Sequence, residues 1–277
     1  MSNLATPAAH AAALRKTYDG IAIGEAGPAL ATAVGGLHLG LDLETSTGID
    51  AAVRATDREL AHRAGVRAGC RVLDAGCGVG GSAVWLAAEL GAVVTGVTLL
   101  DAHVALAQAR ARAAGVDVAF LAADYLGTGL PPASFDLIWQ LESLCHCTQP
   151  AVWLRHAHGL LAPGGRYAAI DVFVGEGGTE VWARLAQTAA FGAPNTLQGY
   201  ASLLRTCGYV DVEVEDLTPR ALASARLWRD FVLLSEALST TPTAARSPLM
   251  TAAIDFADGL ATGALRYGLV LATRGDS

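Results

Sequence analysis

The sequence predicts an α/β protein: a doubly wound, mostly parallel sheet of seven strands with a helical cap over its carboxyl edge. Three observations carry this prediction. Short β-branched runs that are apolar on both faces alternate with helical segments, as in strands covered on both sides by helices. A glycine-rich turn joins the first of these strands to its helix. A long helical stretch then separates the last two strands, and it would lie over the carboxyl edge, where such sheets bind ligands.

The alternating part contributes five strands, which follow one another through right-handed crossovers. They are expected at Arg71–Asp74, Val93–Thr98, Val118–Leu121, Phe135–Trp139 and Arg166–Phe173. The helices between them are expected at Gly81–Leu90, Ala102–Ala114 and Ala151–Leu161, after two earlier helices at Ala8–Tyr18 and Ile49–Gly65. Two closing strands, Tyr209–Val214 and Arg266–Thr273, would form a hairpin-like edge on the sheet.

No internal repeat, low-complexity tract or long linker divides the chain, so residues 1–277 are expected to form one domain. Within it, residues 1–65 would form an N-terminal helical lid and residues 66–174 the ligand-binding core. Residues 175–277 would supply the cap insertions and the closing strands.

Composition narrows the class of protein. Of the 277 residues 52% are hydrophobic and only 16% are charged, which excludes a disordered or coiled-coil chain. The net charge is −7 and no basic run stands out, so nucleic acid is not an expected partner. We expect a soluble, cytoplasmic protein without membrane insertion, because no signal-peptide pattern and no apolar stretch of membrane-spanning length occurs. A homo-oligomer is compatible with the sequence.

The five cysteines are an odd number and widely spread, which favours free thiols in a reducing compartment. Cys145-His146-Cys147 resembles part of a metal site. In a strand, however, the histidine would point away from both cysteines, and no second ligand pair occurs elsewhere. No metal is therefore expected.

The strongest local pattern is the turn after the first strand, VLDAGCGVGG, over residues 72–81. Its Gly76, Gly78 and Gly81 fit the GxGxxG spacing of dinucleotide sites, so an NAD(P)-dependent oxidoreductase is an alternative of another class. A dinucleotide site also needs an acid at the end of the next strand, and Val93–Leu100 contains none. Asp74 would repel a pyrophosphate but suits an ammonium group. A nucleoside with a cationic amino-acid tail, S-adenosylmethionine, therefore fits better.

Several further segments between Tyr18 and Arg274 belong with this turn. They are Leu37-His38-Leu39-Gly40, Ala55-Thr56-Asp57, VTGVT at 94–98, Ala123-Asp124, FDLIW at 135–139, ESLCH at 142–146, LAPGG at 161–165 and the final strand. Through them the chain resembles the class I, Rossmann-like S-adenosylmethionine-dependent methyltransferases. Within that class it resembles the small-molecule group of sterol, tocopherol and prenyl-diphosphate C-methyltransferases and natural-product sugar O-methyltransferases.

The resemblance implies a set of cofactor-binding residues. Asp74, Gly76 and Gly78 would line the methionine part, and Thr98 and Leu99 would lie by the ribose. Asp124 would accept a hydrogen bond from the adenine amino group, with Tyr125 beside the ring. His103 stands where the family often has the glutamine of Ser-x-x-Gln. The full expected set is Asp74, Gly76, Cys77, Gly78, Thr98, Leu99, His103, Asp124, Tyr125 and Leu141.

Three polar residues are candidates for catalysis: Glu142, His146 and Asp171. Glu142 and His146 are four apart, so a helical turn would place them on one face. In the sugar O-methyltransferases that the chain resembles, a histidine and an aspartate at the positions of His146 and Asp171 act as a pair. In the sterol and prenyl C-methyltransferases, the glutamate stabilises a cation or takes a proton. We therefore expect O- or N-methylation, with C-methylation of an isoprenoid or sterol-like alkene as the alternative.

The acceptor would be bound by the lid segments, residues 1–40, 175–200 and 219–265. They are rich in Ala, Leu, Val and Gly, which predicts an enclosed apolar pocket and a small, mostly apolar natural product of secondary metabolism as acceptor. Tyr18, Trp182, Phe191 and Trp228 are the bulky candidates for lining it. Tyr18 would either face the sulfonium through a cation–π contact or pack as an ordinary lid residue.

Overall fold

The computed structural model describes residues 7–23, 38–238 and 248–276. Its centre is a seven-stranded sheet in the order β3-β2-β1-β4-β5-β7-β6. The first five strands in this order run parallel, and β7 is antiparallel to both of its neighbours. The predicted doubly wound sheet is thereby confirmed. Chain order reverses between β1 and β4, which is the place where open α/β sheets bind ligands.

All seven predicted strands are present, and most are longer than expected. Their bounds are β1 Arg71–Ala75, β2 Val93–Thr98, β3 Ala119–Ala122, β4 Phe135–Leu141, β5 Leu161–Val174, β6 Tyr209–Asp216 and β7 Leu265–Arg274. The largest difference is at β5, expected to begin at Arg166. It begins at Leu161 because that residue already pairs with Phe135, and an irregularity in β4 between Phe135 and Leu137 absorbs the turn residues.

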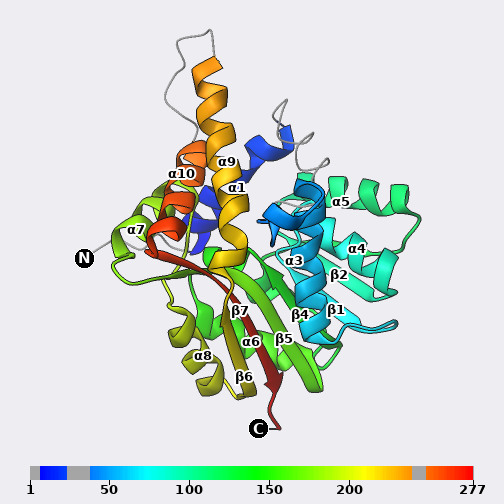
Figure 1. The fold of residues 1–277 in the computed structure, drawn as a ribbon. Helices are drawn as coiled ribbons and strands as arrows, with labels where there is room; N and C mark the ends of the chain where they lie inside the picture. The colour runs from blue at the N-terminus through cyan, green and yellow to red at the C-terminus, as the bar shows by residue number, and fades with distance from the viewer. Residues whose placement is uncertain (1–6, 24–37, 239–247, 277) are drawn as a thin grey trace.

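Helices cover both faces of the sheet (Figure 1). Their bounds are α1 Pro7–Ile23, α3 Ile49–Ala64, α4 Gly81–Leu90, α5 Asp101–Ala114, α6 Pro150–Leu160, α7 Thr179–Thr188, α8 Leu197–Thr206, α9 Thr218–Leu238 and α10 Pro248–Thr262. On one face Leu60 of α3 and Leu86 of α4 pack in a cluster with Trp139 of β4. On the other face Trp153 of α6 and Tyr200 of α8 pack around Tyr167 of β5.

The cap consists of α7, α9 and α10, which stand beyond the end of the sheet with α1 beside them (Figure 1). Helices α9 and α10 occupy most of the stretch expected to be helical between β6 and β7. Apolar residues of the cap, including Leu185 of α7, Ala225 of α9 and Ala252 of α10, join the same cluster as α3 and α4. Among the described helices, none has both the length and the apolar character needed to cross a bilayer.

Residues 39–41 form a short segment that lies against the sheet and its helices. Its backbone N–H groups are satisfied by three different partners. Leu39 N donates to Glu142 Oε1 (2.6 Å), Gly40 N to Ser224 Oγ of α9 (2.9 Å) and Leu41 N to Thr56 Oγ1 of α3 (3.0 Å). The segment is thereby fixed between α3, α9 and the end of β4, where it borders the candidate site.

Candidate active site

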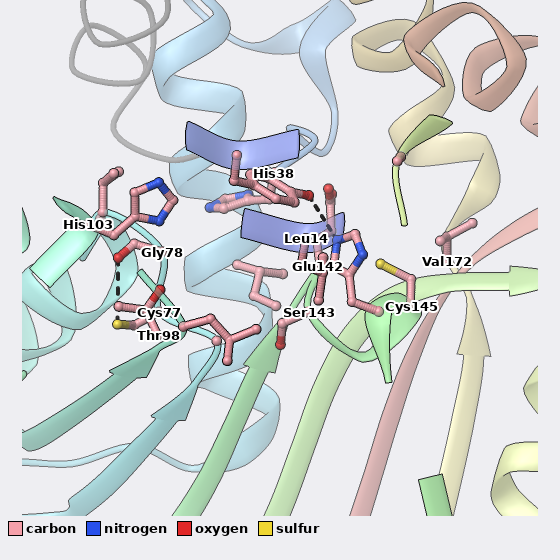
Figure 2. Close-up of a pocket in the computed structure, with 18 of the residues that line it drawn as sticks. Leu14, His38, Cys77, Gly78, Thr98, His103, Glu142, Ser143, Cys145 and Val172 are labelled. Carbon is pink, nitrogen blue, oxygen red and sulfur yellow. Dashed lines mark hydrogen bonds between the residues drawn. The ribbon is translucent and has the colours of Figure 1, made fainter. Parts of the chain in front are cut away.

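A cleft of about 340 Å³ opens at the carboxyl ends of β1, β2 and β4 and continues under the cap helices. Figure 2 shows its two ends. His103, Gly78, Cys77 and Thr98 lie at one end, and Glu142, Cys145 and Val172 lie at the other. The second end continues into the cap, where Leu185, Ala189, Phe191, Ala225, Trp228, Ala252, Ala253 and Phe256 line it. We call these the polar end and the apolar end.

The glycine turn forms the floor of the polar end. Gly76 has a φ of +95°, and a Cβ there would lie 2.3 Å from Ser143 Cβ, so only glycine fits. Gly78 also has a positive φ, +51°, but nothing lies within 4 Å of where its Cβ would be. A side chain at position 78 would therefore enter open space in the cleft. The N–H groups of Gly76 and Cys77 both donate to Val97 O at 2.9 Å, which fixes the turn against β2.

Asp74, at the start of this turn, is buried, and one of its carboxylate oxygens accepts no hydrogen bond from the described residues. It is 3% exposed, and within the described part of the chain its Oδ2 has no hydrogen-bond partner. Burial, and secondarily the charge of Asp57, raises the pKa of Asp74 to about 8. A buried carboxylate without a partner is costly unless a cation or donor meets it. The residues present therefore fit the ammonium group of S-adenosylmethionine.

A second buried acid, Asp57 of α3, lies behind the same end. Its Oδ1 accepts from Ser82 Oγ (2.6 Å) and its Oδ2 from Arg54 Nη1 (2.5 Å), while His38 Nε2 lies 3.7 Å from Oδ1. His38 and Ser82 both line the cleft. In the sequence, His38 and Asp57 lie within two of the family motifs, but neither motif indicated a role for them. Their separation along the chain gave no signal that they meet.

The other expected cofactor residues divide into two groups. Gly76, Cys77, Gly78, Thr98, Leu99, His103, Tyr125 and Leu141 line the cleft together with Asp74. Asp124 does not line it: its side chain is exposed, and Oδ1 accepts from Leu126 N (2.9 Å) as the cap of the short turn Tyr125–Gly127. In this structure Asp124 is thus a turn-capping residue beside the site.

His146 lines the cleft, where its ring contacts that of Phe191 with centroids 5.4 Å apart, and its hydrogen bonds define its tautomer. Nδ1 is 3.1 Å from the carbonyl oxygen of Ala190, which can only accept, so Nδ1 carries the proton. Nε2 is then a lone-pair acceptor, and the hydroxyl of Tyr18, 2.8 Å away, donates to it. Burial lowers the pKa of His146 to about 4, so the ring is neutral at physiological pH. The geometry presents Nε2 as a base toward the cleft.

The carbonyl that orients His146 belongs to a strained residue. Ala190 has a φ of +54°, in the left-handed region that residues with a Cβ seldom adopt. The turn containing it is held by the hydrogen bond from Gly192 N to Cys145 O (2.7 Å). The same hydrogen bond ties the Ala190 turn to the loop that carries His146.

Glu142 follows β4 and also has a positive φ, +48°. Its Oε1 accepts from both Leu39 N (2.6 Å) and Tyr267 OH (2.8 Å). Burial raises the pKa of Glu142 to about 7, although His38 and these two donors oppose the shift. Since Oε1 already receives two donors, a proton on this carboxyl group resides on Oε2.

The expected geometry of Glu142 and His146 differs from the observed one. No helix spans the two residues. A single 3-10 turn covers Leu144–His146, and Glu142 precedes it in a left-handed conformation. Both side chains nevertheless line the cleft.

The carboxylate of Asp171 does not contact His146, although the resemblance implied that the two residues act as a pair. It is fully buried, does not line the cleft, and accepts from Leu144 N (2.6 Å), Cys145 N (3.2 Å) and Val172 N (2.8 Å). His146 uses its two nitrogens for Ala190 and Tyr18, so the expected His146–Asp171 pair does not form in this structure. Burial raises the pKa of Asp171 to about 6 against the effect of these donors. Asp171 therefore positions the loop that carries His146.

Among the four lid residues, Tyr18, Phe191 and Trp228 line the cleft and Trp182 does not. Trp182 packs against Phe191 with ring centroids 5.0 Å apart, and its Nε1 donates to Gly192 O (3.1 Å). It therefore supports a lining residue from behind. The sequence analysis assigned no site role to Leu14 and Phe256, which lie in no motif, or to Leu39, Ser143 and Cys145, which lie within motifs; all five line the cleft.

The fold, the glycine turn and the buried carboxylate together define a class I methyltransferase site. A family model described as a methyltransferase domain matches residues 72–165. The chain is 38% identical over 191 residues to 27-O-demethylrifamycin SV methyltransferase of Amycolatopsis mediterranei, covering 66% of this chain and 69% of that one. It is 32% identical over 222 residues to geranyl diphosphate 2-C-methyltransferase of Saccharopolyspora erythraea, covering 78% of this chain and 71% of that one.

Solved structures agree on the fold. Geranyl diphosphate C-methyltransferase of Streptomyces coelicolor, in complex with Mg²⁺, geranyl-S-thiolodiphosphate and S-adenosylhomocysteine, superposes with a TM-score of 0.77 at 21% identity, covering 99% of this chain and 100% of that one. A phosphoethanolamine N-methyltransferase of Haemonchus contortus was solved in complex with phosphomonomethylethanolamine and S-adenosylhomocysteine. It superposes with a TM-score of 0.74 at 21% sequence identity, covering 95% of this chain and 60% of that one.

This chain belongs to the family of S-adenosylmethionine-dependent methyltransferases that act on small molecules. Its cofactor is S-adenosylmethionine, which settles the choice between a methyl donor and a nicotinamide. Among the described residues, no group of three or more His, Cys, Asp or Glu side chains is arranged to hold a metal ion.

Proposed function

We propose that the protein methylates an oxygen, or a nitrogen, of a small and largely apolar natural product, with His146 as the base. One observation carries the proposal: the Ala190 carbonyl holds the proton on Nδ1, so the Nε2 lone pair, which receives the Tyr18 hydroxyl in this structure, is the acceptor that His146 presents in the cleft. Because burial lowers the pKa of His146 to about 4, the imidazole is neutral at pH 7 and its Nε2 lone pair is not protonated.

The polar end would hold the cofactor. Asp74 would meet the ammonium group, and the glycine turn would lie against the methionine part. Thr98, Leu99 and Tyr125 would border the nucleoside. When bound, S-adenosylmethionine supplies a methyl group already activated on a sulfonium. The residues around it then contribute mainly positioning, which can supply roughly 7–11 kcal/mol of the barrier.

The apolar end would hold the acceptor. Phe191, Trp228 and Phe256 provide broad apolar surfaces, and alanines between them leave room for a scaffold. An acceptor hydroxyl near His146 would donate to Nε2 in place of the Tyr18 hydroxyl, or would reach Nε2 through it. The proton released on methylation then passes from the acceptor oxygen to Nε2.

C-methylation of an isoprenoid or sterol-like alkene is the second candidate, and Glu142 is the observation that favours it. With a pKa raised to about 7 and two donors on Oε1, this carboxyl group can take a proton on Oε2. Such a group would stabilise a carbocation formed when an alkene attacks the methyl group, and would then accept the proton that the cation loses.

Product analysis separates the two candidates. Purified protein, labelled S-adenosylmethionine and a panel of phenols, enols and isoprenoid alkenes would give a methyl ether in the first case. A carbon–methyl bond would result in the second. His146→Ala should abolish ether formation and spare S-adenosylhomocysteine binding. A carbon-methylated product that is lost only in Glu142→Gln would replace our proposal with the second candidate.

We further propose that the protein acts in the cytoplasm as a small-molecule enzyme without a nucleic-acid partner. The five cysteines support the location, because all are free and four of them are buried. Size-exclusion chromatography coupled to light scattering would determine whether it self-associates.

A further inference from the structure

The apolar end of the cleft contains carboxyl and neutral polar groups but no permanent cation. Among the described residues that line the whole cleft, none is Arg or Lys. The residues outside the described ranges add only Arg246, and residues 24–37 contain neither Arg nor Lys. Among the described residues, the acids that line the cleft are Asp74 and Glu142. An acceptor bound at the apolar end would therefore meet no permanent cation, and Glu142 becomes anionic as the pH rises past its pKa of about 7.

None of the four arginines on the described cap helices lines the cleft, and three of them, Arg184, Arg220 and Arg229, are paired with acids. Arg184 of α7 contacts Asp255 of α10 at 2.9 Å. Arg229 of α9 contacts Asp258 of α10 at 3.1 Å. At the base of α9, Arg220 contacts Asp42 at 2.7 Å and Glu59 at 2.9 Å. The fourth, Arg226 of α9, is exposed and does not line the cleft.

The three histidines of the cleft do not replace these cations at the apolar end. His146 is neutral, since burial lowers its pKa to about 4. His38 faces the buried carboxylate of Asp57, with Nε2 3.7 Å from Oδ1. His103 lies beside Gly78 at the polar end (Figure 2), which the cofactor would fill.

We propose that this enzyme selects electrically neutral acceptors and rejects acceptors that carry a phosphate or diphosphate. The inference rests on the proposed use of the apolar end as the acceptor site. It distinguishes this chain from the two structural neighbours above, whose structures contain phosphorylated acceptors or their analogues. An anion in the apolar end would be desolvated without a cationic partner and would face Glu142.

The inference also limits the polar groups that the acceptor carries. The polar groups that it meets are Nε2 of His146 as an acceptor, the hydroxyl of Tyr18 and the carboxyl group of Glu142, all of which line the cleft. Beyond them the lining is alanine, leucine, valine and aromatic side chains. The structure thus assigns an apolar scaffold with a hydroxyl or enol group at its inner end and no charged substituent further out.

Matched pairs of ligands test this selectivity. Geraniol and geranyl diphosphate, and 1-naphthol and 1-naphthyl phosphate, would be titrated into the complex with S-adenosylhomocysteine by calorimetry, with and without Mg²⁺. We expect each alcohol to bind at least about 100-fold more tightly than its phosphorylated partner, because a buried unpaired anion is strongly disfavoured. An anion that binds as tightly as its alcohol, with or without Mg²⁺, overturns the inference.

A variant pair locates the cause of the rejection. At pH 8.5, where Glu142 with its pKa of about 7 is ionised, Glu142→Gln should narrow the ratio of naphthol affinity to naphthyl phosphate affinity by about tenfold, since a like charge near the phosphate is removed. Glu180→Gln, an exposed acid of α7, is the matched control and should change neither. An unchanged ratio in Glu142→Gln contradicts the electrostatic argument. Binding of S-adenosylhomocysteine is measured first in the same protein, so failure of the proposed function is recognised separately.

Discussion

The hydroxyl of Tyr18 lies 2.8 Å from Nε2 of His146 although 128 residues separate the two in the chain. Their rings meet edge to face, with centroids 5.5 Å apart. A second contact joins the same elements, because His10 Nε2 lies 2.8 Å from His146 O. The N-terminal helix α1 therefore contributes side chains to the cleft and hydrogen-bonds to the proposed base.

Replacing the imidazole tests whether it is the base. His146→Ala should lower kcat for ether formation by about 10²–10⁴-fold, the usual contribution of a positioned general base. Affinity for S-adenosylhomocysteine should change little, since the cofactor contacts lie at the other end of the cleft. His62→Ala, an exposed histidine of α3, is the control. Full activity in His146→Ala would contradict the assignment of His146.

Tyr18→Phe isolates the hydroxyl from the ring. It removes the donor to Nε2 but keeps the edge-to-face contact, so we expect kcat to fall by about tenfold through poorer proton transfer. Steady-state kinetics at several pH values is the measurement. A Tyr18→Phe enzyme with an unchanged kcat and a raised KM would show that the hydroxyl serves binding and not proton transfer.

Cofactor affinity should depend on pH through Asp74. With a pKa of about 8 in the ligand-free protein, this carboxyl group is mostly protonated at pH 7 and must ionise to meet an ammonium group. Binding therefore releases a proton, and affinity for S-adenosylhomocysteine should rise by up to about tenfold per pH unit between pH 6 and pH 8. Asp74→Asn should bind weakly with no such slope. Isothermal calorimetry measures both quantities, and a pH-independent affinity of the unchanged protein would refute the prediction.

Stability of the ligand-free protein should fall as pH rises. Burial raises the folded-state pKa of Asp171 to about 6, of Glu142 to about 7 and of Asp74 to about 8. Between the ordinary carboxyl pKa of about 4 and these values, the folded state binds more protons than the unfolded state. The free energy of unfolding then decreases with pH, by about 1.4 kcal/mol per unit for each group titrating.

Thermal unfolding from pH 5.5 to pH 8.5 measures this dependence. Each kcal/mol lost from the free energy of unfolding lowers Tm by about 2–4 °C in domains of about 150–250 residues. S-adenosylhomocysteine should reduce the decline, because its ammonium group stabilises the ionised form of Asp74. A Tm that rises over this range would show that the buried carboxyl groups are not the dominant titrating residues.

Much of the site follows from local pattern. The strand ends carry Asp74, Thr98 and Leu141 to one edge because parallel strands connected by helices must end together. The glycine turn follows for the same local reason, since a sharp turn between β1 and α4 needs backbone conformations that other residues seldom adopt. These residues line the cleft as expected.

Roles that depend on distant partners were less accessible. Asp171 was expected beside His146, but three backbone N–H groups of the neighbouring loop already hold its carboxylate. Asp124 was expected at the adenine, and in the structure one of its oxygens, Oδ1, caps its own turn. In both cases the residue type and position were compatible with two roles. Only the positions of nearby backbone N–H groups in the folded chain decide between the two roles.

The sequence by itself determined the sheet, its order of strands and helices, and the methyl donor, because these depend on periodicity and on residues that are neighbours in the chain. Tertiary structure alone decided which nitrogen of His146 carries the proton, through the carbonyl of Ala190, and which charged groups line the cleft. Those properties arise where α1, the loop after β4 and the cap converge. A hydrogen bond or an ion pair between such segments has no signature in the spacing of their residues.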